Sequence, residues 1–199
     1  MTPLLIPELA TGAAGELETL RAAALEAVDW ACDGASRIGI LAAGRVEDRG
    51  PDWSLDGFGR TIGDGPAVEL PVAVGRWLLR GRSAVAVGSD TAEPRDFDAL
   101  LVMGDGSASR TEKAPRHLDD RAVPFDDHVL AAIGRGVPTE LADLDLALAE
   151  TVAAAGAPAW KRLAQRLDQV VSAQVDAVDD QYGVLYFVAR WIAVPAGRA

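Results

Sequence analysis

The sequence predicts a single α/β domain over residues 1–199, with a central, mostly parallel or mixed sheet flanked by helices. Three observations lead to this class. Helix-like and strand-like segments alternate in the first half of the chain, the strand-like segments are continuous apolar runs of the kind that parallel sheets bury, and turns rich in glycine or proline separate them. A length of 199 residues is ordinary for one domain.

The first half of the chain supplies most of this pattern. Apolar residues recur every three or four positions over Ala14–Ala31, which predicts a helix, and the short apolar run Ser36–Ala43 predicts a buried strand. Residues 44–69 contain six glycines and two prolines, which predicts a long loop of the kind that covers ligand sites. A helix over Leu70–Arg82, starting near Pro71, follows the loop.

Further strands are expected in the middle and at the end of the chain. Ala84–Val87 and Phe97–Met103 are apolar, and the second is typical of the middle of a parallel sheet. Two strand-like runs around Asp179-Asp180-Gln181 close the sequence, and the second of them is rich in aromatic residues.

Three more helices are expected between these strands, over the segments Phe125–Ile133, Leu141–Ala155 and Ala159–Val171. The first of them carries Asp126 and Asp127, expected in its first turn, and Gly134, expected at its end.

The composition argues against several classes of partner. A net charge of -11, from 19 basic and 30 acidic residues, repels phosphate backbones and anionic lipid, so neither nucleic acid nor a membrane is expected as a partner. The single cysteine, Cys32, cannot form an internal disulfide. Without a run of about 18 apolar residues or a signal-peptide pattern, a cytoplasmic location is the simplest expectation.

The start of the chain is unusual. The segment MTPLLIPEL is apolar from the outset and leaves few residues for a complete strand before its exit turn. A domain that lacks the beginning of its first strand is one interpretation of this start.

The stretch GDGSASR, residues 104–110, is the most site-like, because it follows a predicted strand where open α/β sheets bind ligands. Gly104 and Gly106 could free backbone N–H groups for an anion, with Arg110 and Lys113 adding positive charge. The glycine patterns of phosphate-binding loops are not present, so a plain turn is the favoured interpretation.

Side chains of the same stretch are weak catalytic candidates. Ser107 and Ser109 are hydroxyl nucleophile candidates, but the sequence around them is not G-x-S-x-G, and hydroxyls in such loops more often cap backbone groups. His117 and His128, with aspartates between residues 119 and 127, are the weak candidates for metal ligands. The two histidines are eleven positions apart, across a loop and the start of a helix, and this is not a recognised spacing for metal ligands. A charged surface with helix caps is therefore the favoured interpretation.

Three segments together resemble the class III extradiol ring-cleavage dioxygenase family, in its B-subunit-like form: PLLIPELATGAAGELETLRAA, LLVMGDGSASRTEKAPRHLDDRAVPFDDHVLAAI and YGVLYFVARW. The central block is similar to G-D-x-S-H followed by Ala-Pro and a later Phe-Asp. The resemblance implies the family's fold. In active members, it implies cleavage of an aromatic diol ring with O₂ at Fe(II), held by two histidines and a glutamate, with a further histidine as acid–base.

The chain departs from that pattern at the functional positions. The acid–base histidine of G-D-x-S-H falls on Ala108, the first ligand histidine falls at about Met1, and no histidine occurs before His117. Loss of imidazole ligands removes most of the affinity for iron, and loss of a proton-transfer group costs about 10²–10⁴ in rate. The resemblance therefore implies the fold without its standard reaction.

The favoured hypothesis is a non-catalytic binding or structural protein with no cofactor, whose cleft takes a small molecule between the 44–69 loop, Asp105–Arg110 and the segment near Tyr182. The alternative is a ring-cleaving or related oxidoreductase. It would bind Fe(II) through His117, His128 and an aspartate, or react through Asp105, Ser107 and Arg110 without a metal. A third hypothesis is a homo-oligomer paired through the aromatic closing strand.

Overall fold

The computed structural model describes residues 2–13, 15–56, 58–90 and 97–197. Its first sheet consists of three parallel strands in the order β2-β1-β3: β1 (Ile38–Ala42), β2 (Val85–Gly88) and β3 (Ala99–Met103). The predicted α/β class with a parallel sheet is confirmed.

A second sheet is an antiparallel hairpin of β4 (Leu167–Asp179) and β5 (Tyr186–Pro195). The turn between them contains a 3-10 helix, η4 (Gln181–Gly183), in which Tyr182 has a φ of 63° and Gly183 a φ of 70°. The two strand-like runs at the end of the sequence are thus confirmed, although they form a sheet separate from the parallel one.

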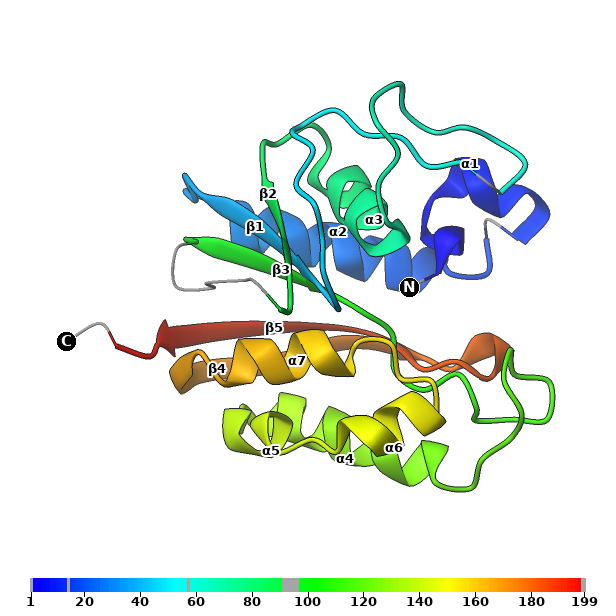
Figure 1. Ribbon diagram of the computed structural model, residues 1–199, viewed down its shortest axis with the longest axis vertical. Coiled ribbons are helices and arrows are strands. Elements are labelled where there is room, and N and C mark those ends of the chain that lie inside the picture. Colours follow the sequence, from blue (N-terminus) through cyan, green and yellow to red (C-terminus); the bar gives the residue numbers. More distant parts are fainter. Residues whose placement is uncertain (1, 14, 57, 91–96, 198–199) are drawn as a thin grey trace.

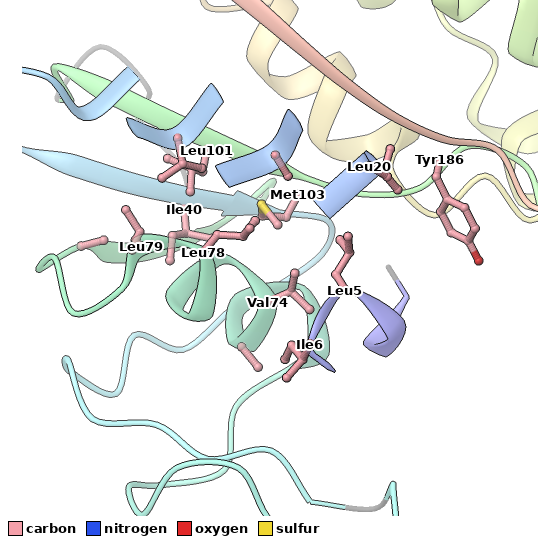
Figure 2. Packing of buried hydrophobic residues seen from close by; sticks show 14 of the residues in the cluster. Leu5, Ile6, Leu20, Ile40, Val74, Leu78, Leu79, Leu101, Met103 and Tyr186 are labelled. Carbon is pink, nitrogen blue, oxygen red and sulfur yellow. The ribbon is translucent and has the colours of Figure 1, made fainter. Parts of the chain in front are cut away.

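Helices lie on both sides of the strands (Figure 1). On one side, α2 (Glu18–Cys32) and α3 (Leu70–Leu79) form an apolar cluster with the parallel sheet, in which Leu78 packs near Ile40 (Figure 2). The other side is covered by α4 (Ala122–Arg135), α5 (Pro138–Ala142), α6 (Leu146–Thr151) and α7 (Ala157–Ala164). Leu41 packs on Ala159 of α7, so successive residues of β1 face opposite helical layers.

β3 is an edge strand of the parallel sheet, whereas the sequence predicts it in the middle. It is nearly all apolar because both of its faces are covered. Leu101 and Met103 belong to the cluster with α2 and α3, whereas Leu100 and Val102 pack on the α7 side. A continuous apolar strand therefore indicates two covered faces and does not require a central position.

The apolar start of the chain is helical, where the sequence suggests the end of a first strand. It forms two short helices, η1 (Pro3–Leu5) and α1 (Pro7–Ala10), followed by η2 (Thr11–Ala13). A proline opens each of the first two, where its missing N–H costs nothing, and the Thr2 hydroxyl accepts a hydrogen bond from the Leu4 N–H at 3.2 Å. Leu5 and Ile6 are buried.

α4 differs from its predicted bounds at both ends. It begins at Ala122, so Asp126 and Asp127 lie beyond its first turn, and it continues through Gly134. Its cap is Gly136, whose φ of 65° is the left-handed conformation that glycine adopts at no steric cost.

Two of the predicted helices also need correction. The segment Leu141–Ala155 is interrupted, because the Asp145 carboxylate accepts hydrogen bonds from two backbone N–H groups and begins α6 as a separate helix. The helix expected over Ala159–Val171 stops at Ala164, and β4 starts at Leu167. Backbone pairing with β5 outweighs the helical spacing of the apolar residues there.

Among the described residues, no helix has both the length and the apolar character needed to cross a membrane.

Candidate functional site

The loop of residues 104–110 leaves the carboxyl end of β3 and is fixed to the segment before β5. The Gly106 N–H donates to the Leu185 carbonyl at 2.9 Å, and the Leu185 N–H donates to the Ser107 carbonyl at 3.0 Å. Further along, the Arg110 N–H donates to the Gly183 carbonyl at 3.2 Å. The loop therefore lies where the sequence predicts a site, but as an ordered, paired segment.

A buried carboxylate fastens the same loop to α4. Asp126 is fully buried, and it accepts hydrogen bonds from the Ser107 N–H at 2.9 Å, the Ser107 hydroxyl at 2.6 Å and Nη1 of Arg110 at 2.7 Å. The Arg110 guanidinium also lies 3.5 Å from an Asp180 carboxylate oxygen in the β4–β5 turn. We call Asp126, Ser107 and Arg110 the Asp126 cluster; it joins the loop, α4 and the hairpin.

Sequence reasoning misses this role of Asp126, which it treats as a helix-cap or metal-ligand candidate. The signal lies in its spacing, because it shares one helix face with the buried Ala122, Phe125 and Val129. A carboxylate on a buried helix face needs a hydrogen-bonding or charged partner. Arg110, which follows the predicted strand, is a residue of the right charge for that role.

Four N–H groups of the loop already donate within the protein and are not free to bind an anion. The N–H groups of Gly106, Ser107 and Arg110 all donate within the protein, and the Ala108 N–H donates to the Val152 carbonyl at 3.0 Å. The glycines are explained by close packing instead. A Cβ on Gly104 would lie 2.2 Å from Cα of Gly156.

Ser107 also lacks the surroundings of a nucleophile. Its side chain is fully buried and donates to a carboxylate, and both histidines, His117 and His128, are exposed. Ala108 packs against the apolar cluster that α2 and α3 form with the parallel sheet. Within the described residues there is no group of three or more His, Cys, Asp or Glu side chains that could hold a metal ion.

Two ionisable groups, Asp105 and Tyr186, lie at the buried end of β3. Burial raises the pKa of the Asp105 carboxyl above its ordinary value. Burial, with the neighbouring charge of Asp105, raises the pKa of Tyr186 to about 12, against the opposing hydrogen bond with Thr2. Both groups are therefore held toward their protonated forms.

We expect Tyr186→Phe to remove a phenol ionisation near pH 12, read from the absorbance of phenolate. The unfolded chain releases that proton near pH 10, so the folded state binds more protons between about pH 10 and 12, and stability falls as the pH rises through this window. Tyr186→Phe should reduce this loss of stability at high pH. Tyr182→Phe, a change at the exposed second tyrosine, should not alter it. A step near pH 12 that survives in Tyr186→Phe would show that Tyr186 is not its source.

A cavity of about 510 Å³ lies between the parallel sheet and the hairpin. β3 and β5 form its two long sides, α2 lies over one face, and Trp160 and Leu163 of α7 lie over the other. Asp105 and Tyr186 line its inner end.

This cavity differs from the predicted cleft. Asp105 lines it, but neither Tyr182 nor the described residues of the 44–69 loop do. The 44–69 loop packs instead over α3, where Leu55 is buried and Asp48 pairs with the buried Arg76 at 2.9 Å. The glycine-rich composition correctly predicts a loop but not which side of the sheet it covers.

Comparison of the chain with protein-family models gives no match, and comparison with curated proteins gives none either.

Proposed function

We propose that this protein is a non-catalytic binding protein of the dioxygenase-like fold, and that its ligand occupies the cavity between β3 and β5. The observation that carries the proposal is the cavity itself. Its volume of about 510 Å³ falls in the range of about 300–1,000 Å³ usual for ligand pockets. Its walls are mainly apolar and aromatic, with Asp105 at one end.

The Asp126 cluster supports the non-catalytic part of the proposal. An acid–base or nucleophilic group has to reach a substrate with a free proton or lone pair. Here the Ser107 hydroxyl and the Arg110 guanidinium both donate to a buried carboxylate. The loop is thus used to hold the hairpin and α4 together.

The two alternatives stay predictions. An oxidoreductase would need Fe(II) bound through His117, His128 and an aspartate, or chemistry by Asp105, Ser107 and Arg110. A homo-oligomer paired through the closing strand would have a solution mass that is a multiple of the mass of one chain.

Binding of Nile red, an uncharged dye that fluoresces in apolar surroundings, tests the proposal. The wild-type protein should bind it, and Ala27→Phe should weaken binding at least about tenfold, because Ala27 of α2 lines the cavity and a phenyl ring would fill part of it. Ala22→Phe is the matched control, an exposed position of the same helix. Equal dye binding by the wild type and Ala27→Phe, or no binding by the wild type, would contradict the proposal.

A further inference from the structure

The residues that line the cavity show that it lies in the plane of the strands. Side chains of a strand alternate between two faces, so a cavity over one face is lined by every second residue. Here every residue from Phe97 to Asp105 lines the cavity, and so does every residue from Tyr186 to Ala193. The cavity therefore runs along the edges of β3 and β5.

Each of these edges lacks a strand neighbour in the part of the chain that the structure describes. β3 pairs only with β1, and β5 pairs only with β4. A strand edge presents a row of backbone N–H and C=O groups, which are costly to bury without partners. The cavity is thus bordered by two rows of hydrogen-bonding groups that face each other.

At its inner end the gap is already closed by hydrogen bonds. Beyond β3, Gly106 pairs with Leu185 through the bonds described above, and Arg110 pairs with Gly183. These bonds connect the two chain segments in opposite directions, as in an antiparallel pair. From this point the two strands diverge. The gap between β3 and β5 therefore begins where the hydrogen bonds between the two segments end.

The walls above and below the gap are apolar. α2 contributes Leu20, Ala24 and Val28 on one face, and Ile133, Trp160 and Leu163 lie over the other. The charged side chains among the lining residues have protein partners. Asp98 accepts hydrogen bonds from two backbone N–H groups, Arg190 pairs with Asp176 at 2.7 Å, and Arg166 also has a partner within the protein. A suitable occupant is uncharged, with apolar groups on two faces and hydrogen-bonding groups on two edges.

An extended peptide has this distribution of groups, because its amides point to both edges and its side chains to both faces. We propose that the cavity receives an uncharged, apolar segment of another polypeptide as an inserted strand, which joins the two sheets in the order β2-β1-β3-peptide-β5-β4. This inference rests on the proposed binding function and names the class of ligand. With β3 five residues long, the inserted segment is about five residues.

The test uses the full-length protein and the capped peptide acetyl-Val-Ala-Val-Ala-Val-amide. Its control is the same peptide with both alanines N-methylated, which keeps the side chains but removes two N–H donors from one edge. We expect the parent peptide to bind in calorimetry and to slow hydrogen exchange in β3 and β5. The N-methylated peptide should bind at least about tenfold more weakly. Ala27→Phe should weaken binding of the parent peptide and Ala22→Phe should not.

The outcomes separate this inference from the function on which it rests. Equal binding of the two peptides, or no peptide binding by a protein that binds Nile red, would overturn strand insertion and leave the binding function intact. Slower hydrogen exchange that is confined to elements other than β3 and β5 would also overturn strand insertion. If neither the peptides nor Nile red bind, both proposals fail.

Discussion

Replacing Asp126 by alanine should lower the free energy of unfolding by about 3–5 kcal/mol, the cost of breaking a buried ion pair by removing one partner. Asp126 is fully buried and accepts three hydrogen bonds, two of them from Ser107 and one from Arg110. Its removal leaves the guanidinium, whose side chain is only 13% exposed, without its closest carboxylate. The buried N–H and hydroxyl of Ser107 lose their acceptor at the same time.

Denaturant unfolding measures this change, and Asp127→Ala is the matched control. Asp127 is the next residue of α4 and is exposed, so its replacement should change stability by no more than about 0.5 kcal/mol. Equal and small effects at the two positions would show that the Asp126 cluster does not hold the loop.

Gly104→Ala is the second substitution with a large expected effect. A Cβ at this position would lie 2.2 Å from Cα of Gly156, a backbone atom that moves only with its segment. We expect a destabilisation of about 1–3 kcal/mol, the usual cost of overpacking, or more if the segment before α7 cannot shift.

Gly134→Ala is the control for that experiment. A Cβ on Gly134 meets its nearest atom, a methyl of Val175, at an ordinary 3.6 Å, and the residue lies within α4. Alanine favours a helix over glycine by up to about 1 kcal/mol, so this variant should be as stable as the wild type or more so. Thermal unfolding measures the stability of both variants against the wild type. A Gly104→Ala protein as stable as Gly134→Ala would contradict the close approach of the two segments.

Local sequence signals are sufficient to locate the strands of the parallel sheet along the chain, but not their order in the sheet. The apolar run at β1 and the helical periodicity of α2 are determined by residues close in sequence, and both elements form near the predicted bounds. The region after Ala159 is different. Val170 fits the helical spacing of Trp160 and Leu163, yet it pairs with Ala193 in the hairpin. A contact between residues so far apart in sequence cannot be read from the apolar spacing around Val170.

In the candidate site too, one part can be predicted from local sequence and another depends on contacts between distant residues. GDGSASR is correctly predicted at the end of a strand, because the position of a loop follows from the element before it. The partner of Ser107 and Arg110 lies on α4, and only the folded structure brings Asp126 to them. The cavity is not predictable from the sequence, since it arises from the divergence of β3 and β5, which are distant in sequence.

We propose that this chain binds a ligand and does not cleave aromatic rings at iron. The most direct measurement is the iron content of the purified protein after anaerobic loading with Fe(II), determined together with the turnover of a panel of catechols in the presence of O₂. We predict iron far below one equivalent per chain and no ring-cleaved product. One equivalent of iron with ring cleavage would contradict the claim.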